Sequence, residues 1–169
     1  MHILIATTGV LPAAPVADLC EPFLREGGEV TVMTVIEVPR RFLESMDAEE
    51  RRSFLDDTAW QTDTAEMKAL GYLEERGRRA VEPVVAALRA RGREAVVKFV
   101  EGNDPVEAIV GLAAQVGATM IIMGATRRLF TEQAWTSVSA QVMERSQCPL
   151  LLVPGGRSDD TGENPRLEM

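Results

Sequence analysis

Five short apolar runs, separated by segments of helical periodicity, constrain the fold of this chain more than any other feature of its sequence. The run at residues 3–6 is continuously apolar and ends at turn residues, which is typical of a strand buried on both faces of a parallel sheet. The run at residues 30–38 is rich in β-branched residues and ends at a proline, so it also predicts a strand. The other three predicted strands cover residues 95–100, 119–123 and 149–153.

The interval between the first two runs predicts an amphipathic helix. Its apolar residues recur at helical spacing, and Gly27 and Gly28 then supply a stop. Cys20 falls on the apolar stripe, so we expect it to pack in the core rather than to react. The predicted stripe consists of Val16, Leu19, Cys20, Phe23 and Leu24.

The segment at residues 40–91 is highly charged and contains no strand-like run. Asp47 and Glu50 form a capping pattern that predicts a short helix. A longer helix follows, which Pro83 must kink or restart because proline lacks an amide donor. We interpret the charges of this segment as a solvated face. The apolar stripe of the longer helix is predicted at Leu70, Leu73, Ala80, Val81, Val84 and Leu88.

Residues 104–107 carry a strong helix start. Asp104 is suited to the N-cap, Pro105 to the first helical position and Glu107 to the third. Gly117 is expected to close this helix. Its buried stripe is predicted at Val106, Ile109, Val110, Ala113 and Val116.

Strands that alternate with helices predict an α/β fold, in which helices cover both faces of a five-stranded parallel sheet. A last predicted helix, around Val138 and Val142, completes the alternation. The length suffices for one domain, which we assign to residues 1–155. Residues 156–169 are polar and without pattern, so we expect a flexible C-terminal tail.

The formal net charge of −8 argues against nonspecific binding to nucleic acid or to an anionic membrane, because both would repel the chain. Cys20 and Cys148 are far apart and form no C-x-x-C pattern, so neither a zinc cluster nor a redox dithiol is indicated. The N-terminal apolar run is too short for a signal peptide core or a membrane span. We therefore expect a cytoplasmic protein in a reducing compartment.

Ligands of doubly wound sheets bind beyond the carboxyl ends of the strands, where the strand order reverses. The candidate binding residues at these ends are Thr7, Thr8 and Gly9 after the first strand, Ile36 in the second, residues 101–103 after the third, and Gly124 after the fourth.

The loop after the fourth predicted strand has the composition of an anion cradle. It contains Arg127 and Arg128, and the next helix begins near Thr136, Ser137 and Val138. Free amides at a helix start, together with hydroxyl groups, bind phosphate, and arginines add charge-assisted hydrogen bonds. The alternative is that Thr136 or Ser137 only caps the helix while both arginines lie in solvent.

No set of residues indicates a catalytic or metal site. The one histidine, His2, is expected at the amino end of the first strand, away from the ligand crevice. The aspartates and glutamates show no metal-ligand spacing. The sequence thus favours a binding protein over an enzyme.

Several segments together resemble the universal stress protein family over residues 2–154. The resemblance implies a sheet in the order 3-2-1-4-5 and a homodimer made through the strand Leu150, Leu151, Leu152 and Val153. The segments that carry it are residues 3–5 (ILI), 101–105 (EGNDP), 121–124 (IIMG), 137–139 (SVS) and 148–154 (CPLLLVP).

Some members of that family bind ATP through the pattern G-x2-G-x9-G-[ST], from which this chain departs. Gly124 matches the first glycine, but Arg127 replaces the second. If Ser137 is matched to the motif serine, Thr136 replaces the third glycine and one residue is missing. If the spacing is kept, Ser137 takes the glycine position and Val138 the hydroxyl position. Side chains at these places obstruct the close approach of backbone to phosphate.

A second departure concerns the end of the first strand, where the resemblance implies an aspartate and this chain has Thr8. Threonine donates and accepts hydrogen bonds but supplies no carboxylate for a ribose or a metal. Thr8 is either a ligand contact or a turn residue.

Three hypotheses follow for the function. The first is a non-enzymatic stress-response or regulatory binding protein with a degenerate nucleotide-binding loop. The second is an ATP- or AMP-binding protein in which Arg127 and Arg128 replace the glycine amides, with at most slow ATP hydrolysis. A sensor for another anion is a third, which the sequence does not separate from the second.

Overall fold

The computed structural model describes residues 1–24, 27–36, 65–125 and 137–154 of the chain. Five parallel strands form one sheet in the order β3-β2-β1-β4-β5, which confirms the expected fold class and strand order. In the centre, Leu4 of β1 is in register with Thr31 of β2 and with Ile121 of β4. The strands are β1 (His2–Ala6), β2 (Glu29–Ile36), β3 (Val96–Glu101), β4 (Met120–Ala125) and β5 (Leu150–Pro154).

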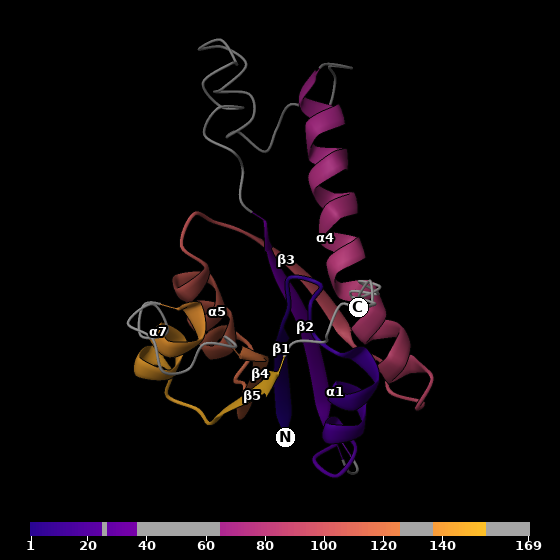
Figure 1. The fold of residues 1–169 in the computed structure, drawn as a ribbon, viewed down its shortest axis with the longest axis vertical. Coiled ribbons are helices and arrows are strands. Elements are labelled where there is room, and N and C mark those ends of the chain that lie inside the picture. Colours follow the sequence, from indigo (N-terminus) through magenta and orange to yellow (C-terminus); the bar gives the residue numbers. More distant parts are fainter. Residues whose placement is uncertain (25–26, 37–64, 126–136, 155–169) are drawn as a thin grey trace, which may run out of the picture.

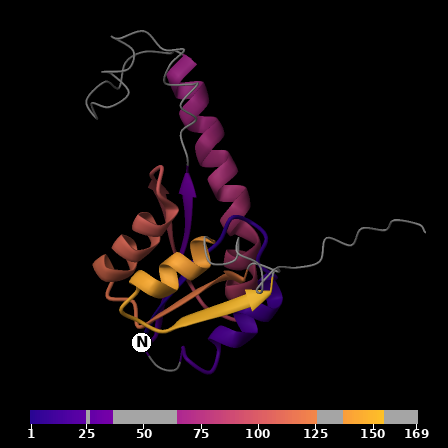
Figure 2. The same ribbon diagram turned by 60° about the vertical axis from the view of Figure 1, so that its left-hand side comes forward.

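Helices cover both faces of the sheet, α1 and α4 on one and α5 and α7 on the other (Figure 1 and Figure 2). Side chains alternate across a strand. Ile3 and Ile5 of β1 therefore belong to the core beneath α1 and α4, while Leu4 belongs to the core beneath α5 and α7. The helices are α1 (Ala13–Cys20), α4 (Ala65–Arg89), α5 (Pro105–Gln115) and α7 (Val138–Arg145).

Helix α1 ends earlier than its apolar spacing predicts, so the predicted stop at Gly27 and Gly28 is wrong. Pro22 has no amide hydrogen with which to continue the helix. Only part of the predicted stripe is buried: Leu24 is fully buried, whereas Leu19, inside α1, and Phe23, beyond its end, are 39% and 42% exposed.

Helix α4 continues through Pro83 instead of restarting there, which corrects that part of the prediction. Pro83 and Arg79 are both exposed, so water can solvate the Arg79 carbonyl that the missing amide leaves without its helical partner. Leu73, Val81 and Leu88 are buried as expected. The short helix predicted at Asp47 and Glu50, and the predicted tail, lie outside the described residues.

Helix α5 begins as predicted. The Asp104 carboxylate accepts hydrogen bonds from the Val106 and Glu107 amides, at 2.9 and 3.3 Å. Gly117, which follows the helix, has φ +64°, a conformation that other residues rarely adopt. Its stripe differs slightly from the prediction, because Val110 and Val116 are only partly buried. The residues buried by α5 are Val106, Ile109, Leu112 and Ala113.

His2 lies at the amino edge of the sheet. Its Nε2 atom is 2.8 Å from Thr31 Oγ1, and its Nδ1 atom is 3.3 Å from Glu29 Oε2. Its neighbours thus all belong to the amino ends of strands, as the sequence predicts.

Cys20 gives a test of core burial. Burial raises the pKa of its thiol from 9.0 to about 11. Between pH 9 and pH 11 the unfolded chain therefore loses this proton while the folded chain keeps it, so the free energy of unfolding falls, by roughly 2–3 kcal/mol at pH 11. Urea unfolding at several pH values would measure the loss. In Cys20→Ala this contribution to the pH dependence should vanish, and an unchanged dependence would contradict the assignment.

Two glycines of α4 make a matched pair for testing how closely the helix packs. A Cβ atom on Gly77 would lie 2.9 Å from Phe99 Cδ1 and 3.2 Å from Ile36 Cδ1, whereas one on Gly71 would meet nothing within 4 Å. Gly71→Ala should raise the free energy of unfolding by about 0.5–1 kcal/mol through helix propensity. Gly77→Ala should be neutral or destabilising, because the Phe99 ring must move. Equal gains in urea unfolding would count against close packing at Gly77.

Candidate functional site

A cavity of about 1060 Å³, here called the carboxyl-end cavity, opens at the carboxyl ends of the strands. It lies where the strand order reverses, with β2 on one side of β1 and β4 on the other. Its walls come from the loop after β1, the ends of β2 and β4, one face of α4, and the starts of α5 and α7. This is the position at which open α/β sheets bind ligands.

The loop after β1 contributes Thr7, Thr8 and Gly9 to the cavity, the three residues expected there. The Thr7 amide donates to the Met33 carbonyl of β2, and Thr7 Oγ1 accepts from the Gly9 amide, each at 3.0 Å. Thr7 is therefore the residue that stabilises the turn. The Thr8 side chain is exposed and forms no hydrogen bond to the described residues, so its hydroxyl is available to a ligand.

Gly9 needs to be glycine because of its backbone conformation, and it lies in contact with α4. Its φ is +94°, and a Cβ atom there would lie 3.4 Å from Ala80 Cα of α4. The loop after β1 is thereby held against α4.

The floor of the cavity is apolar. Ile36, which ends β2, lines it as expected. Met33, Ile109 and Met123 line it too, and all three also belong to the core beneath α5 and α7. The floor is thus the end of that core.

Gly124 of β4 lines the cavity, as the sequence predicts. A Cβ atom on it would meet only Leu11 Cδ2, at 3.8 Å. Packing within the described part of the protein therefore does not demand glycine here, and the space above Gly124 belongs to the cavity.

At the start of α7, Val138 and Ser139 line the cavity but Ser137 does not. Ser137 is the N-cap: its Oγ accepts from the Ala140 amide at 3.3 Å and lies 3.1 Å from Ser139 Oγ. The geometry of Ser137 thus agrees with the alternative in which this residue caps the helix. The other candidates of this loop, Arg127, Arg128 and Thr136, lie outside the described residues.

Sequence reasoning left open whether the segment at residues 40–91 covers the crevice, and it named no residue of the wall that α4 forms. Leu73, Gly77 and Ala80 line the cavity from it, together with Arg76 and Arg79. The two arginines are the charged residues among the described lining, which contains no carboxylate. The helical spacing predicted a buried stripe through Leu73 and Ala80. It did not indicate that the N-terminal part of this stripe lies beside the carboxyl ends of the strands. Asn103, before α5, adds an amide side chain within the segment that was expected to contribute.

Within the described ranges, no three or more His, Cys, Asp or Glu side chains gather where they could hold a metal ion. Among the helices that the structure describes, none is long and apolar enough to cross a membrane.

Several solved structures share this fold. A protein of the universal stress protein family from Burkholderia pseudomallei is 20% identical, with 91% of this chain and 96% of that chain covered and a TM-score of 0.57. An Arabidopsis thaliana universal stress protein family member with AMP bound is 10% identical, with 96% and 97% covered and a TM-score of 0.57. A universal stress protein in complex with cAMP is 19% identical, with 92% and 98% covered and a TM-score of 0.53.

No curated protein matches the sequence significantly. The sequence does match the universal stress protein family over residues 1–154, nearly the whole chain, and this match confirms the resemblance carried by its motifs. The chain therefore belongs to the universal stress protein family.

Proposed function

We propose that the chain is a non-enzymatic regulatory protein of the stress response that binds an adenine mononucleotide, such as AMP, in the carboxyl-end cavity. The observation that carries the proposal is the cavity itself, whose volume of about 1060 Å³ suits a small ligand. Its apolar floor suits a base, Thr8 offers a hydroxyl group, and the described lining contains two arginines and no carboxylate. An anionic ligand is favoured by such a lining.

Two of the similar structures support the choice of ligand, since one has AMP bound and another is in complex with cAMP. Both ligands are adenine mononucleotides.

The thiols of Cys20 and Cys148 form no disulfide, which fits our proposal that the protein acts in the reducing cytoplasm.

The loop sequence favours a mononucleotide over ATP. A triphosphate needs several backbone amides at close range, and Arg127 stands where the second glycine of the ATP-binding pattern belongs. The one histidine, His2, lies at the amino end of β1, so no imidazole base reaches the cavity. Binding without turnover is the proposed outcome.

Calorimetric titration of the full chain tests this function. We expect AMP to bind and ATP to bind at least about tenfold more weakly, which corresponds to about 1.4 kcal/mol. No phosphate should be released from ATP. Tighter binding of ATP together with phosphate release would favour the alternative, an ATP-binding protein with a remodelled cradle.

A pair of glycine variants locates the ligand. Gly124→Leu should abolish AMP binding, because the side chain extends into the space above Gly124 that belongs to the cavity. Gly111→Leu, at an exposed position of α5 with nothing within 4 Å of a Cβ atom, should bind AMP like the wild type. Undiminished binding by a folded Gly124→Leu variant would exclude the carboxyl-end cavity.

We also propose a homodimer that forms through β5. The strand lies at one edge of the sheet, and Leu150, Leu151 and Leu152 are only partly buried. The opposite edge, β3, also exposes apolar side chains, those of Val96, Val97 and Phe99, but Lys98 and Glu101 are exposed among them, and charges protect an edge from pairing. Apolar β5 is therefore the edge better suited to a second copy.

The amide of Leu152 tests this pairing. The Ile121 amide donates to the Pro149 carbonyl, and partners alternate along a parallel strand, so the Leu152 amide points away from β4. Leu152→Pro should give a monomer in light scattering at micromolar concentration, whereas Leu152→Ala, which keeps the amide, should remain a dimer. A wild-type monomer, or a dimeric Leu152→Pro variant, would refute pairing through β5.

A further inference from the structure

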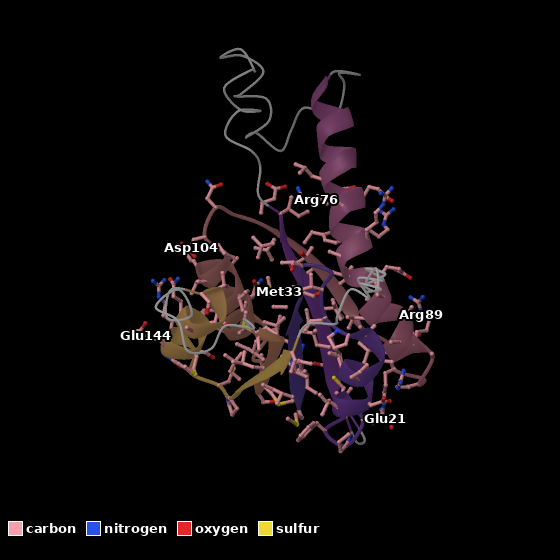
Figure 3. The ribbon with its side chains drawn as sticks, in the orientation of Figure 1. Glu21, Met33, Arg76, Arg89, Asp104 and Glu144 are labelled. Atoms are coloured by element: carbon pink, nitrogen blue, oxygen red, sulfur yellow. The ribbon has the colours of Figure 1, made fainter. Side chains whose placement is uncertain are left out.

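One row of residues on α4 faces the carboxyl-end cavity. Leu73, Arg76, Gly77 and Ala80 all line it, and their spacing of three and four residues places them on one side of the helix. Arg76 is the charged member of a row that is otherwise apolar or glycine. Figure 3 shows its side chain extending from α4 toward the region where β2 ends.

Gly77 explains why Arg76 lies over the strand ends. The Phe99 ring of β3 and the Ile36 side chain of β2 fill the space that a side chain at Gly77 would occupy. Helix α4 therefore runs close to the ends of both strands. Arg76, the residue before Gly77, therefore lies at the rim of the cavity.

The arginines of this helix differ in their partners. Glu75 pairs with Arg79, at 2.9 Å from Nε to Oε1, and with Arg78, at 3.5 Å from Nη1 to Oε2. Arg76 has no ion pair or hydrogen bond among the described residues. Within the part of the chain that the structure describes, its guanidinium is thus a cation without a direct counter-charge, and the chain as a whole has a net charge of −8.

We propose that Arg76 holds the phosphate group of the bound mononucleotide. This inference rests on the proposed function and assigns the phosphate contact to α4 instead of to the loop after β4. A guanidinium donates two parallel hydrogen bonds to phosphate oxygens, which replaces the glycine amides that the loop lacks. A single phosphate is the group that one arginine can hold in this way.

The test compares AMP with adenosine, which lacks the phosphate, by calorimetric titration of the full chain. Arg76→Gln should weaken AMP binding on the order of tenfold to a hundredfold, as expected for a lost charge-assisted hydrogen bond, and leave adenosine binding unchanged. Arg78→Gln is the matched control. It removes the same charge at a position two residues further along α4, and the Arg78 side chain does not line the cavity. It should leave both affinities within about twofold.

The outcomes separate this inference from the proposed function. If the wild type binds AMP and Arg76→Gln binds it equally well, the role of Arg76 is refuted while the proposed function stands. Equal weakening by both variants would show only a long-range effect of charge and would also refute it. The role of Arg76 would likewise be refuted if Arg76→Gln lost affinity for AMP and for adenosine to the same extent. If the wild type binds neither compound, the proposed function fails and the role of Arg76 fails with it.

Discussion

Strand β1 is enclosed on every side, and the arrangement of the remaining elements depends on this. It is in register with β2 along one edge and with β4 along the other. Ile3, Leu4 and Ile5 have no exposed surface, because helices cover both faces. A strand in this position must be apolar throughout. Its carboxyl end is thereby fixed in the middle of the molecule, and the turn at Thr7 opens directly into the carboxyl-end cavity.

The three inner strands, β1, β2 and β4, were predictable because burial on both faces requires a short, mainly apolar run between turn residues. The ends of the helices were harder to predict. The apolar spacing alone extended α1 past Pro22, but proline has no amide hydrogen with which to continue a helix, and α1 ends at Cys20. The Phe23 side chain, which fits the apolar spacing, is exposed. Pro83 shows the reverse case, since an exposed turn of α4 tolerates the same chemical defect. Proline ends a helix or is accommodated according to its surroundings, which the sequence does not display.

The residues of the candidate site likewise include some that were predictable from the sequence and some that were not. The lining residues at the carboxyl ends of strands, such as Thr8 after β1 and Gly124 near the end of β4, were predicted because parallel strands bring their carboxyl ends to one edge. The α4 wall was not, because residues 37–64 separate it from β2 and hide the direction in which its stripe faces. Gly77 gave no signal at all: its close contact with Phe99 exists only in three dimensions.

Met33, Ile109 and Met123 belong at once to the cavity floor and to the core beneath α5 and α7. An occupant of the cavity would therefore add to the core, and its binding free energy would add to the stability of the folded chain. Occupancy would then slow unfolding and proteolysis, so that cellular abundance of the protein would follow the concentration of its ligand. The lifetime of the folded protein would in that case depend on how much of its ligand is present.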